Sequence, residues 1–164
     1  MKYEIERRFL VQHDGWRRDC ANGRLFRQGF LSTVKERVVR VRVVAEQATL
    51  TIKGVVQQGF TRPEFEYPIP LDDACYLLEH LCQPPLIEKR RYTMAVGKLL
   101  WEIDEFFGDN LGLIVAEVEL HQEGQDITPL PDWLGREVTH DARYCNANLV
   151  HHPWGKWSQS EQDR

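Results

Sequence analysis

The strongest constraint in this sequence is a repeated pairing of like charges at alternate positions. Glu4 and Glu6 begin the chain in this way, and Arg40 and Arg42 repeat the pattern with the opposite sign. Side chains two residues apart project to the same face of a β-strand, while the residue between them, such as Ile5, projects to the other face. The pattern therefore predicts a chain built mainly of strands with one charged face and one apolar face.

The same alternation recurs between short turns that contain glycine, asparagine or proline. The clearest pair is a hairpin over residues 38–45 and 48–53. A helix is predicted over 71–82, where acidic residues precede an apolar stripe of helical period. Further strands are predicted over residues 3–12, 24–33, 62–67, 86–96, 99–107 and 113–121, with a short helix over 142–150. About eight strands joined mostly by short turns predict a mainly β (α+β) fold that closes its edges as a barrel.

Length and composition narrow the class of protein. The chain has 164 residues, of which 42% are hydrophobic, so one compact domain with its own core is expected. We place this domain at residues 1–152 and a polar C-terminal tail at 153–164. The net charge of -4 creates no general field that would favour nucleic acid or a membrane surface. We therefore expect neither partner.

The cysteines and the absence of long apolar runs favour a cytoplasmic location. No stretch approaches the roughly 18 apolar residues of a membrane span. The four cysteines show no metal-binding spacing, and we expect them to be reduced thiols. They are Cys20, Cys75, Cys82 and Cys145.

The charged faces can point outward, as in an ordinary barrel, or inward, as in an inverted one. Like charges two residues apart repel each other on a plain surface, but they are favourable when a ligand of opposite charge lies between them. The amphipathic helix over 71–82 also needs an apolar outer surface to cover. We therefore favour a closed, eight-stranded antiparallel β-barrel with a charged lumen and a few helices packed outside. The lumen would collect Glu4, Glu6, Glu64, Glu66, Glu102, Asp104, Glu117 and Glu119 with Arg8, Arg40, Arg42, Lys53, Arg62, Lys89 and Arg91.

These residue types indicate a chemistry. Carboxylates at this density bind hard divalent cations, Mg²⁺ or Mn²⁺ in preference to zinc. Arginine and lysine bind phosphate oxygens, arginine through its bidentate fork. A lumen with both suits a linear polyphosphate carried with its metal. Catalysis would consist mostly of electrostatic stabilisation and positioning, with a metal-activated water attacking the terminal phosphorus.

The ordered set of motifs resembles the CYTH superfamily, the triphosphate tunnel metalloenzymes. Glu4-x-Glu6-x-Arg8 is similar to the E-x-E-x-K signature of that family, and the match continues in order from about residue 2 to residue 150. The later motifs are Arg40-x-Arg42, Leu50-Thr51-Ile52-Lys53-Gly54, Arg62 with Glu64 and Glu66, Lys89-x-Arg91-Tyr92, Trp101-Glu102-Ile103-Asp104 and Ala116-Glu117-Val118-Glu119.

The resemblance implies a tunnel that binds triphosphate with Mg²⁺ or Mn²⁺. Members include inorganic, thiamine and RNA triphosphatases and a class of adenylate cyclases, and short single-domain forms resemble inorganic triphosphatases most. Glu4, Glu6 and Arg8 would be catalytic. The metal would be held by Glu4, Glu6, Glu117 and Glu119, supported by Asp104 or Glu66. Substrate would be bound by Arg8, Arg40, Arg42, Lys53, Arg62, Lys89 and Arg91.

Two residues depart from the pattern of the family. The signature lysine is Arg8 here, which stays charged in proteins and so can bind phosphate but cannot act as a general base. Phe30 stands where relatives often carry tyrosine after Gln-Gly. We expect metal-dependent hydrolysis of inorganic triphosphate or a related small-molecule triphosphate. The alternatives are a class IV type adenylate cyclase, a thiamine triphosphatase and a non-catalytic polyphosphate- or nucleotide-binding module, and a homodimer is left open.

Overall fold

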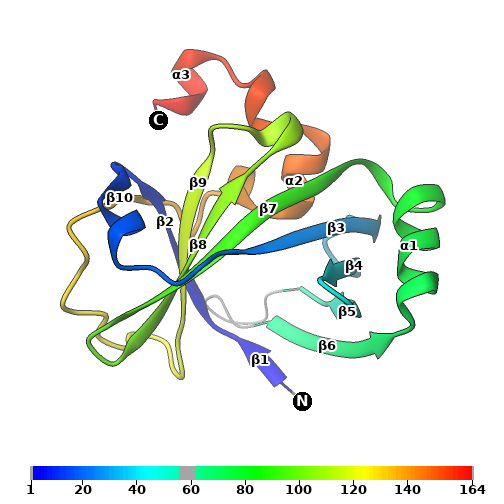
Figure 1. Cartoon of the computed structure of the whole chain (residues 1–164), viewed down its shortest axis with the longest axis horizontal. Helices are drawn as coiled ribbons and strands as arrows, with labels where there is room; N and C mark the ends of the chain where they lie inside the picture. The colour runs from blue at the N-terminus through cyan, green and yellow to red at the C-terminus, as the bar shows by residue number, and fades with distance from the viewer. Residues whose placement is uncertain (1, 56–61, 164) are drawn as a thin grey trace.

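The structure, a computed structural model, describes residues 2–55 and 62–163, with side chains described over 5–55 and 63–163. Strands are the predominant element of the described chain, helix α1 lies between two strands, and the other short helices lie at the C-terminal side (Figure 1). The strands are β1 (Lys2–Glu4), β2 (Glu6–Val11), β3 (Arg24–Ser32), β4 (Val38–Val44), β5 (Gln47–Lys53), β6 (Arg62–Ile69), β7 (Gln83–Val96), β8 (Leu99–Phe106), β9 (Ile114–Glu119) and β10 (Leu134–Glu137). The helices are α1 (Leu71–His80), α2 (Asn146–His151) and α3 (Gln159–Gln162), with 3-10 turns η1 (Asp14–Arg18), η2 (Gly108–Asn110), η3 (Ala142–Tyr144) and η4 (Trp154–Lys156).

All strand pairings in the described chain are antiparallel. The ten strands form one sheet in the order β1-β6-β5-β4-β3-β7-β8-β9-β2-β10. Most neighbours in this order are also neighbours in sequence, as the short turns predicted. The predicted mainly β, antiparallel fold is therefore confirmed.

The two halves of the N-terminal segment join opposite ends of the sheet. β1 pairs with β6, where Glu4 lies opposite Arg62, and β2 pairs with β9, where Arg8 lies opposite Glu117. Between β1 and β2 lies Ile5, whose carbonyl accepts a hydrogen bond from the backbone N–H of Leu120 at 2.8 Å. The expected single strand over 3–12 is thus interrupted where it changes partner. The sheet has ten strands where eight were expected, and β1 and β10 are its two ends, so no strand pairing in the described chain closes it as the predicted barrel would require. The chain at Ile5 links β1 to β2 across this gap.

The charged residues face inward, as the inverted barrel predicted. In the β4–β5 pair, Arg42 lies opposite Thr49 on the inner face, and Val41 lies opposite Leu50 on the outer face. Helix α1 covers this outer face, and its Ala74 packs in a buried cluster with Val41. Figure 1 shows α1 standing against the side of the sheet that carries β4 and β5.

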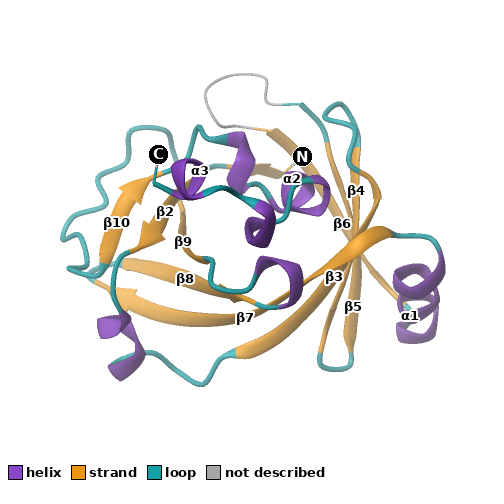
Figure 2. Ribbon diagram, turned by 90° about the horizontal axis from the view of Figure 1, so that it is seen from above, coloured by secondary structure: helices purple, strands orange, loops and turns teal. Residues whose placement is uncertain are grey.

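Two other apolar clusters surround the remaining strands. One lies outside β2, β7, β8 and β9, where Trp101 is covered by Trp16 of η1 and by Trp133. The other lies beneath the C-terminal helices, where Leu149 of α2 and Trp157 pack with Phe30. In Figure 2, α2 and α3 lie over the opening that the strands surround. Within residues 153–163, Pro153 and Trp157 are buried, and Trp157 is only 5% exposed, so these two side chains attach the segment to the barrel.

Element boundaries differ from the expected ones around the Pro-Pro sequence. The helix expected over 71–82 ends at His80. The strand expected over 86–96 begins earlier, at Gln83 of β7, so Pro84 and Pro85 lie within it. Gly29 of β3 allows a close approach to the residues that follow α1, because a Cβ there would lie 2.7 Å from the Cβ of Cys82. In the described part of the chain, no helix has the length and apolar character needed to cross a membrane.

Candidate functional site

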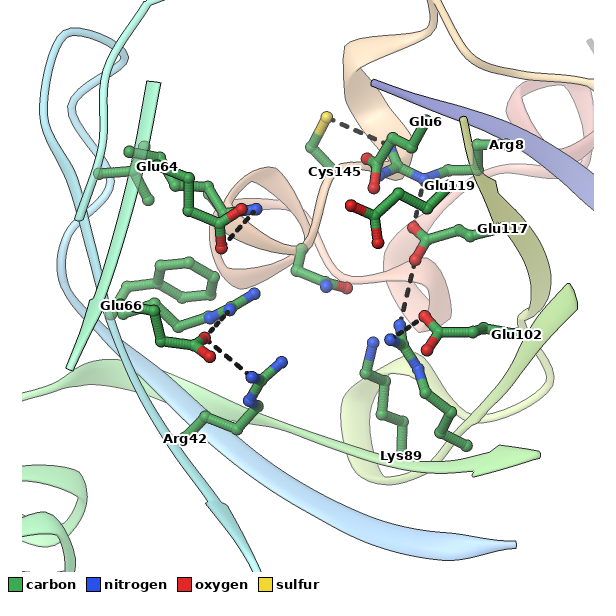
Figure 3. Close-up of a pocket in the computed structure, with 17 residues that line it drawn as sticks. Glu6, Arg8, Arg42, Glu64, Glu66, Lys89, Glu102, Glu117, Glu119 and Cys145 are labelled. Carbon is green, nitrogen blue, oxygen red and sulfur yellow. Dashed lines mark hydrogen bonds and ion pairs between the residues drawn. The ribbon is translucent and has the colours of Figure 1, made fainter. Parts of the chain in front are cut away.

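The inner face of the barrel encloses a cavity of about 250 Å³. Figure 3 shows its labelled acidic and basic side chains projecting toward a common space. Twelve of its seventeen lining residues are charged, so it is suited to a small, highly polar ligand. These are Glu6, Arg8, Arg40, Arg42, Lys53, Glu64, Glu66, Lys89, Arg91, Glu102, Glu117 and Glu119, and the others are Phe30, Val38, Cys145, Asn146 and Ala147.

One wall of the cavity is acidic and comes from β2, β8 and β9. The register places Glu6 opposite Glu119 and Glu102 opposite Glu117. These four carboxylates lie together on one side of the cavity in Figure 3. We call them the acidic wall. Their proximity follows from alternate spacing on adjacent strands, because side chains of the same face lie side by side.

Arg8 is the cation embedded in the acidic wall. Its Nε donates to Glu117 Oε1 at 2.7 Å, its Nη2 donates to Glu6 Oε1 at 2.6 Å, and its Nη1 lies 3.4 Å from Cys145 Sγ. Burial alone would lower the pKa of Arg8, but the charges of Glu117 and Glu6 outweigh it and raise the pKa well above its usual value. Arg8 is therefore a permanent positive charge held in a fixed orientation.

A second wall of the cavity is basic and comes from β4, β5 and β6. Arg42 Nη2 donates to Glu66 Oε2 at 2.9 Å, and Arg40 Nη2 donates to Thr51 Oγ1 at 3.1 Å. Lys53 Nζ lies 3.8 Å from Glu64 Oε1. We call Arg40, Arg42 and Lys53 the basic wall. Among the side chains that the structure describes, the carboxylates in contact with these cations are those of Glu64 and Glu66.

The floor between the walls is formed by two cations of β7 and one carboxylate of β8. Arg91 donates to Asp104 from Nε to Oδ1 and from Nη2 to Oδ2, both at 2.7 Å, and Lys89 forms an ion pair with the same carboxylate. Burial, followed by the charge of Arg91, lowers the pKa of Lys89. Burial would raise the pKa of Asp104, but Arg91 and Lys89 lower it below the usual range. Asp104 is therefore ionised and holds both cations in place.

Most of the residues predicted for the site meet in this cavity. Asp104 is the exception, since it lies behind the wall at 1% exposure and reaches the cavity only through Lys89 and Arg91. The side chains of Glu4 and Arg62 lie outside the described residues, although their backbones pair with each other. The predicted residues that line the cavity are Glu6, Arg8, Arg40, Arg42, Lys53, Glu66, Lys89, Arg91, Glu117 and Glu119.

Sequence reasoning gave no metal- or substrate-binding role to several residues that line the cavity. Glu64 and Glu102 were expected in the lumen from the same alternation as the assigned charges, and both line the cavity. Cys145 and Asn146 come from the start of α2, and neither of these two residues was assigned a site role from the sequence. Their position depends on how the C-terminal segment folds back over the strands.

The acidic wall fits a hard divalent cation in its chemistry. Its donors are carboxylate oxygens, which Mg²⁺ and Mn²⁺ prefer, and no thiol or imidazole of the described cavity lining except Cys145 competes with them. Among the described side chains, those of residues 5–55 and 63–163, no three acidic, His or Cys groups converge closely enough to hold a metal ion by themselves. Glu6 and Glu117 are held instead by Arg8, and Glu66 lies with the basic wall.

Comparison with known proteins identifies relatives of the chain and agrees with its fold. The family model described as the CYTH domain matches residues 2–152. A protein of Acetivibrio thermocellus named inorganic triphosphatase is 45% identical over 159 residues, which are 97% of this chain and all of the relative.

Solved structures give the same result. The crystal structure of the inorganic triphosphatase NE1496 is 30% identical with a TM-score of 0.64, covering 92% of this chain and 95% of that one. The PH1012 protein from Pyrococcus horikoshii is 16% identical with a TM-score of 0.58, covering 73% and 79%, and at this identity it shows the fold alone. Together with the family match over residues 2–152, these likenesses show that the chain belongs to the CYTH domain family.

Proposed function

We propose that this protein is a metal-dependent triphosphatase that hydrolyses inorganic triphosphate inside the barrel. The observation that carries the proposal is a single cavity with an acidic wall opposite a basic wall. The basic wall and floor complement a polyanion, while the acidic wall complements the cation that accompanies it. Two relatives, at 45% and 30% identity, are named inorganic triphosphatases, which supports the same activity here.

The size and lining of the cavity favour inorganic triphosphate over a nucleotide or thiamine triphosphate. Pockets that enclose drug-sized ligands usually measure about 300–1,000 Å³ and are predominantly apolar. This cavity measures about 250 Å³, and most of its lining is charged. It is suited to a chain of phosphates, and it offers little apolar surface to an adenine or thiamine ring.

The basic residues would position the substrate. Arg40, Arg42 and Lys53 lie on one side of the cavity, and Lys89 and Arg91 lie on its floor. Arginine can bind phosphate through two parallel N–H···O bonds, so the pair on β4 can clamp adjacent phosphates. This placement would hold the terminal phosphorus for attack by water as the P–O bond to the leaving pyrophosphate breaks.

Arg8 would stabilise the charge that develops during the reaction. Because it remains protonated, it can donate hydrogen bonds to phosphate oxygens throughout, and it takes no proton from water. Its contacts with Glu117 and Glu6 embed it in the acidic wall, from which it would reach the substrate. We propose that Glu4, Glu6, Glu117 and Glu119 hold Mg²⁺ or Mn²⁺, and that Glu66 and Asp104 support the site by orienting basic residues.

A divalent cation held there would neutralise phosphate charge and lower the pKa of bound water. The residues of the chain would supply the rest, which is binding, orientation and exclusion of bulk water by the α2 segment. The four cysteines are free thiols, which supports a cytoplasmic location. Whether the protein forms a homodimer is testable by sedimentation.

The proposal is tested by phosphate release from inorganic triphosphate with Mg²⁺, with Mn²⁺ and with chelator, beside ATP and thiamine triphosphate. A Glu6→Gln, Glu119→Gln variant would be compared with Glu79→Gln, an exposed carboxylate on α1. We expect metal-dependent release from triphosphate, retained by Glu79→Gln and reduced at least a hundredfold by the double variant.

Two results would contradict the proposal. Tight binding of triphosphate with no release from any substrate would indicate a binding module that senses polyphosphate. Formation of cyclic AMP from ATP in preference to hydrolysis of triphosphate would indicate a cyclase. A circular dichroism spectrum of the double variant would show whether lost activity reflects lost fold.

A further inference from the structure

Strand β3 contributes no charge to the cavity lining, yet one of its residues contacts three of the cations. Phe26 lies on the inner face of β3, opposite Lys89 on β7 and Val44 on β4. The centroid of its ring is 5.3 Å from Arg91 Cζ, 5.7 Å from Arg42 Cζ and 5.9 Å from Lys89 Nζ. Phe26 thus lies at the meeting point of the basic wall and the floor.

Phe26 lies behind these cations and not beside the ligand space. It is partly buried, and it is not among the residues that line the described cavity, whereas Arg42, Lys89 and Arg91 all are. In Figure 3, Arg42 and Lys89 project into the cavity from its lower part. The ring therefore contacts the side chains that would meet a phosphate, and not the phosphate itself.

Arg42, Lys89 and Arg91 carry like charges, and electrostatic repulsion favours their separation. Like charges in a partly desolvated site repel each other strongly. Their anionic partners counter this only unevenly, because Asp104 holds Lys89 and Arg91 while Arg42 is held by Glu66 on the other side. The ring of Phe26 is a contact that all three cations share.

An aromatic ring provides this contact without competing with the substrate. The negative face of the ring attracts a cation through its quadrupole, as do carboxylates, but it carries no net charge. A carboxylate at this position would cancel positive potential and occupy N–H donors. The ring leaves the net charge of the cluster unchanged and leaves N–H groups available for phosphate oxygens.

We propose that Phe26 is a positioning residue that gathers Arg42, Lys89 and Arg91 into one phosphate-binding cluster through cation–π contacts. This inference rests on the proposed binding of triphosphate in the cavity and adds a residue to it. Because each such contact corresponds to roughly a two- to fivefold change in an equilibrium constant, loss of the ring should weaken triphosphate binding about tenfold.

The test replaces Phe26 with 4-fluoro-, 3,5-difluoro- and 3,4,5-trifluorophenylalanine, which weaken the quadrupole in steps and nearly preserve shape. We expect KM for triphosphate to rise with each fluorine and kcat to change less than twofold. The dissociation constant for triphosphate, measured by calorimetry, should rise in parallel. The same series at Phe65, which is exposed on β6 and carries no cation over its ring among the described residues, should leave KM unchanged.

Two conventional variants complete the test. Phe26→Leu keeps apolar volume and should raise KM about tenfold, whereas Phe26→Tyr keeps the ring face and should remain within twofold of the parent. A flat KM across the fluorinated series, in a protein that binds and hydrolyses triphosphate, would overturn this inference alone. Failure of the unsubstituted protein to bind triphosphate would overturn the proposed function and this inference with it.

Discussion

Lys89 and Asp104 form an ion pair that is buried on both sides, with each side chain only 2% exposed. Arg91 shares the same carboxylate through a bidentate contact, so one anion holds two cations beneath the cavity. A buried charge that loses its partner is strongly destabilising, because it has neither water nor a counter-ion. This arrangement separates residues that hold the site from residues that would meet the ligand.

Asp104→Asn should therefore destabilise the fold. In this variant, Lys89 loses its ion pair with Asp104, and neither Glu102 nor Glu117 forms an ion pair with Lys89 that could replace it. Arg91 also loses Asp104 but keeps its contacts with Glu102 and Glu117. We expect the free energy of unfolding to fall by about 3–5 kcal/mol, measured by urea denaturation.

A paired replacement provides the control for this prediction. Lys89→Met with Asp104→Leu removes both charges at once and should recover much of the lost stability, as apolar replacement of buried ion pairs often does. It should not recover triphosphate binding, because Lys89 would be gone. If Asp104→Asn and the parent unfolded with the same free energy, the buried ion pair would not contribute to stability as proposed.

Substitutions of Arg8 should separate charge from geometry. Lysine keeps the positive charge but cannot bridge Glu117 and Glu6 with one planar fork, so Arg8→Lys should lower kcat/KM by about tenfold or less. Glutamine removes the positive charge and leaves the carboxylates of Glu117 and Glu6 without their counter-ion. Arg8→Gln should therefore lower kcat/KM at least a hundredfold.

Steady-state kinetics on triphosphate measures both effects. Arg7→Gln is the matched control, since Arg7 is next in sequence but pairs with Glu137 outside the cavity. Its kcat/KM should stay close to that of the parent. Equal losses in Arg8→Lys and Arg8→Gln would mean that fork geometry matters more than charge.

Glu117 of the acidic wall should make the free energy of unfolding depend on pH at values below the ordinary pKa of a glutamate side chain. Burial would raise the pKa of Glu117, but the charges of Arg8 and Arg91 outweigh it and hold the pKa well below its usual value. As pH falls through the unfolded-state value near 4.5, the unfolded chain takes up a proton that the folded protein does not. The stabilising contribution of Glu117 is therefore complete above that pH and declines as pH falls toward the folded-state pKa.

Unfolding in urea at pH 7, 5, 4 and 3 measures this decline. The difference in unfolding free energy between the parent and Glu117→Gln should be largest at pH 7 and 5, and should shrink by about 1–3 kcal/mol at pH 3. Glu88→Gln, which removes an outer carboxylate that is half exposed, is the matched control. A constant difference for Glu117→Gln would show that its pKa is not depressed.

The C-terminal segment should stabilise the barrel. Trp157 is 5% exposed, and its ring centroid lies 5.1 Å from that of Tyr144. Trp157→Ala should lower the free energy of unfolding by about 3–5 kcal/mol through lost burial and the cavity left behind. Leu130→Ala, at a side chain that is 54% exposed, should change it by less than about 0.5 kcal/mol. A neutral Trp157→Ala would mean that residues 153–163 are dispensable for folding.

The sequence predicts the inner face well because that face depends on a period of two. Once Glu117 and Glu119 are known to lie on a strand, both must share a face with Arg8 across the ladder. The pattern does not distinguish Glu102 from Asp104, although one lines the cavity and the other is buried behind it. The neighbour on β7 distinguishes the two carboxylates, since Asp104 lies opposite Arg91 and Glu102 lies opposite Thr93.

Other features depended on tertiary contacts that local sequence does not encode. The polar composition of residues 153–164 concealed that Trp157 would be buried against Tyr144. Cys145 reaches Arg8 only because η3 and α2 fold back over the strands. The interruption at Ile5 arises from a change of strand partner, and its local sequence is that of an uninterrupted strand.

The divided N-terminal segment has a consequence for how the protein folds. During folding, β2 pairs with β9, which is distant in sequence: Arg8 and Glu117, which are in contact, are separated by 109 positions. Such distant pairing incurs a large loop-closure entropy and slows folding, whereas the β4–β5 hairpin can form locally. We therefore expect the acidic wall to assemble last, in the step that docks residues 2–11. Affinity for a divalent cation would then appear only with the fully folded chain, so partly folded molecules would not bind the metal in this site.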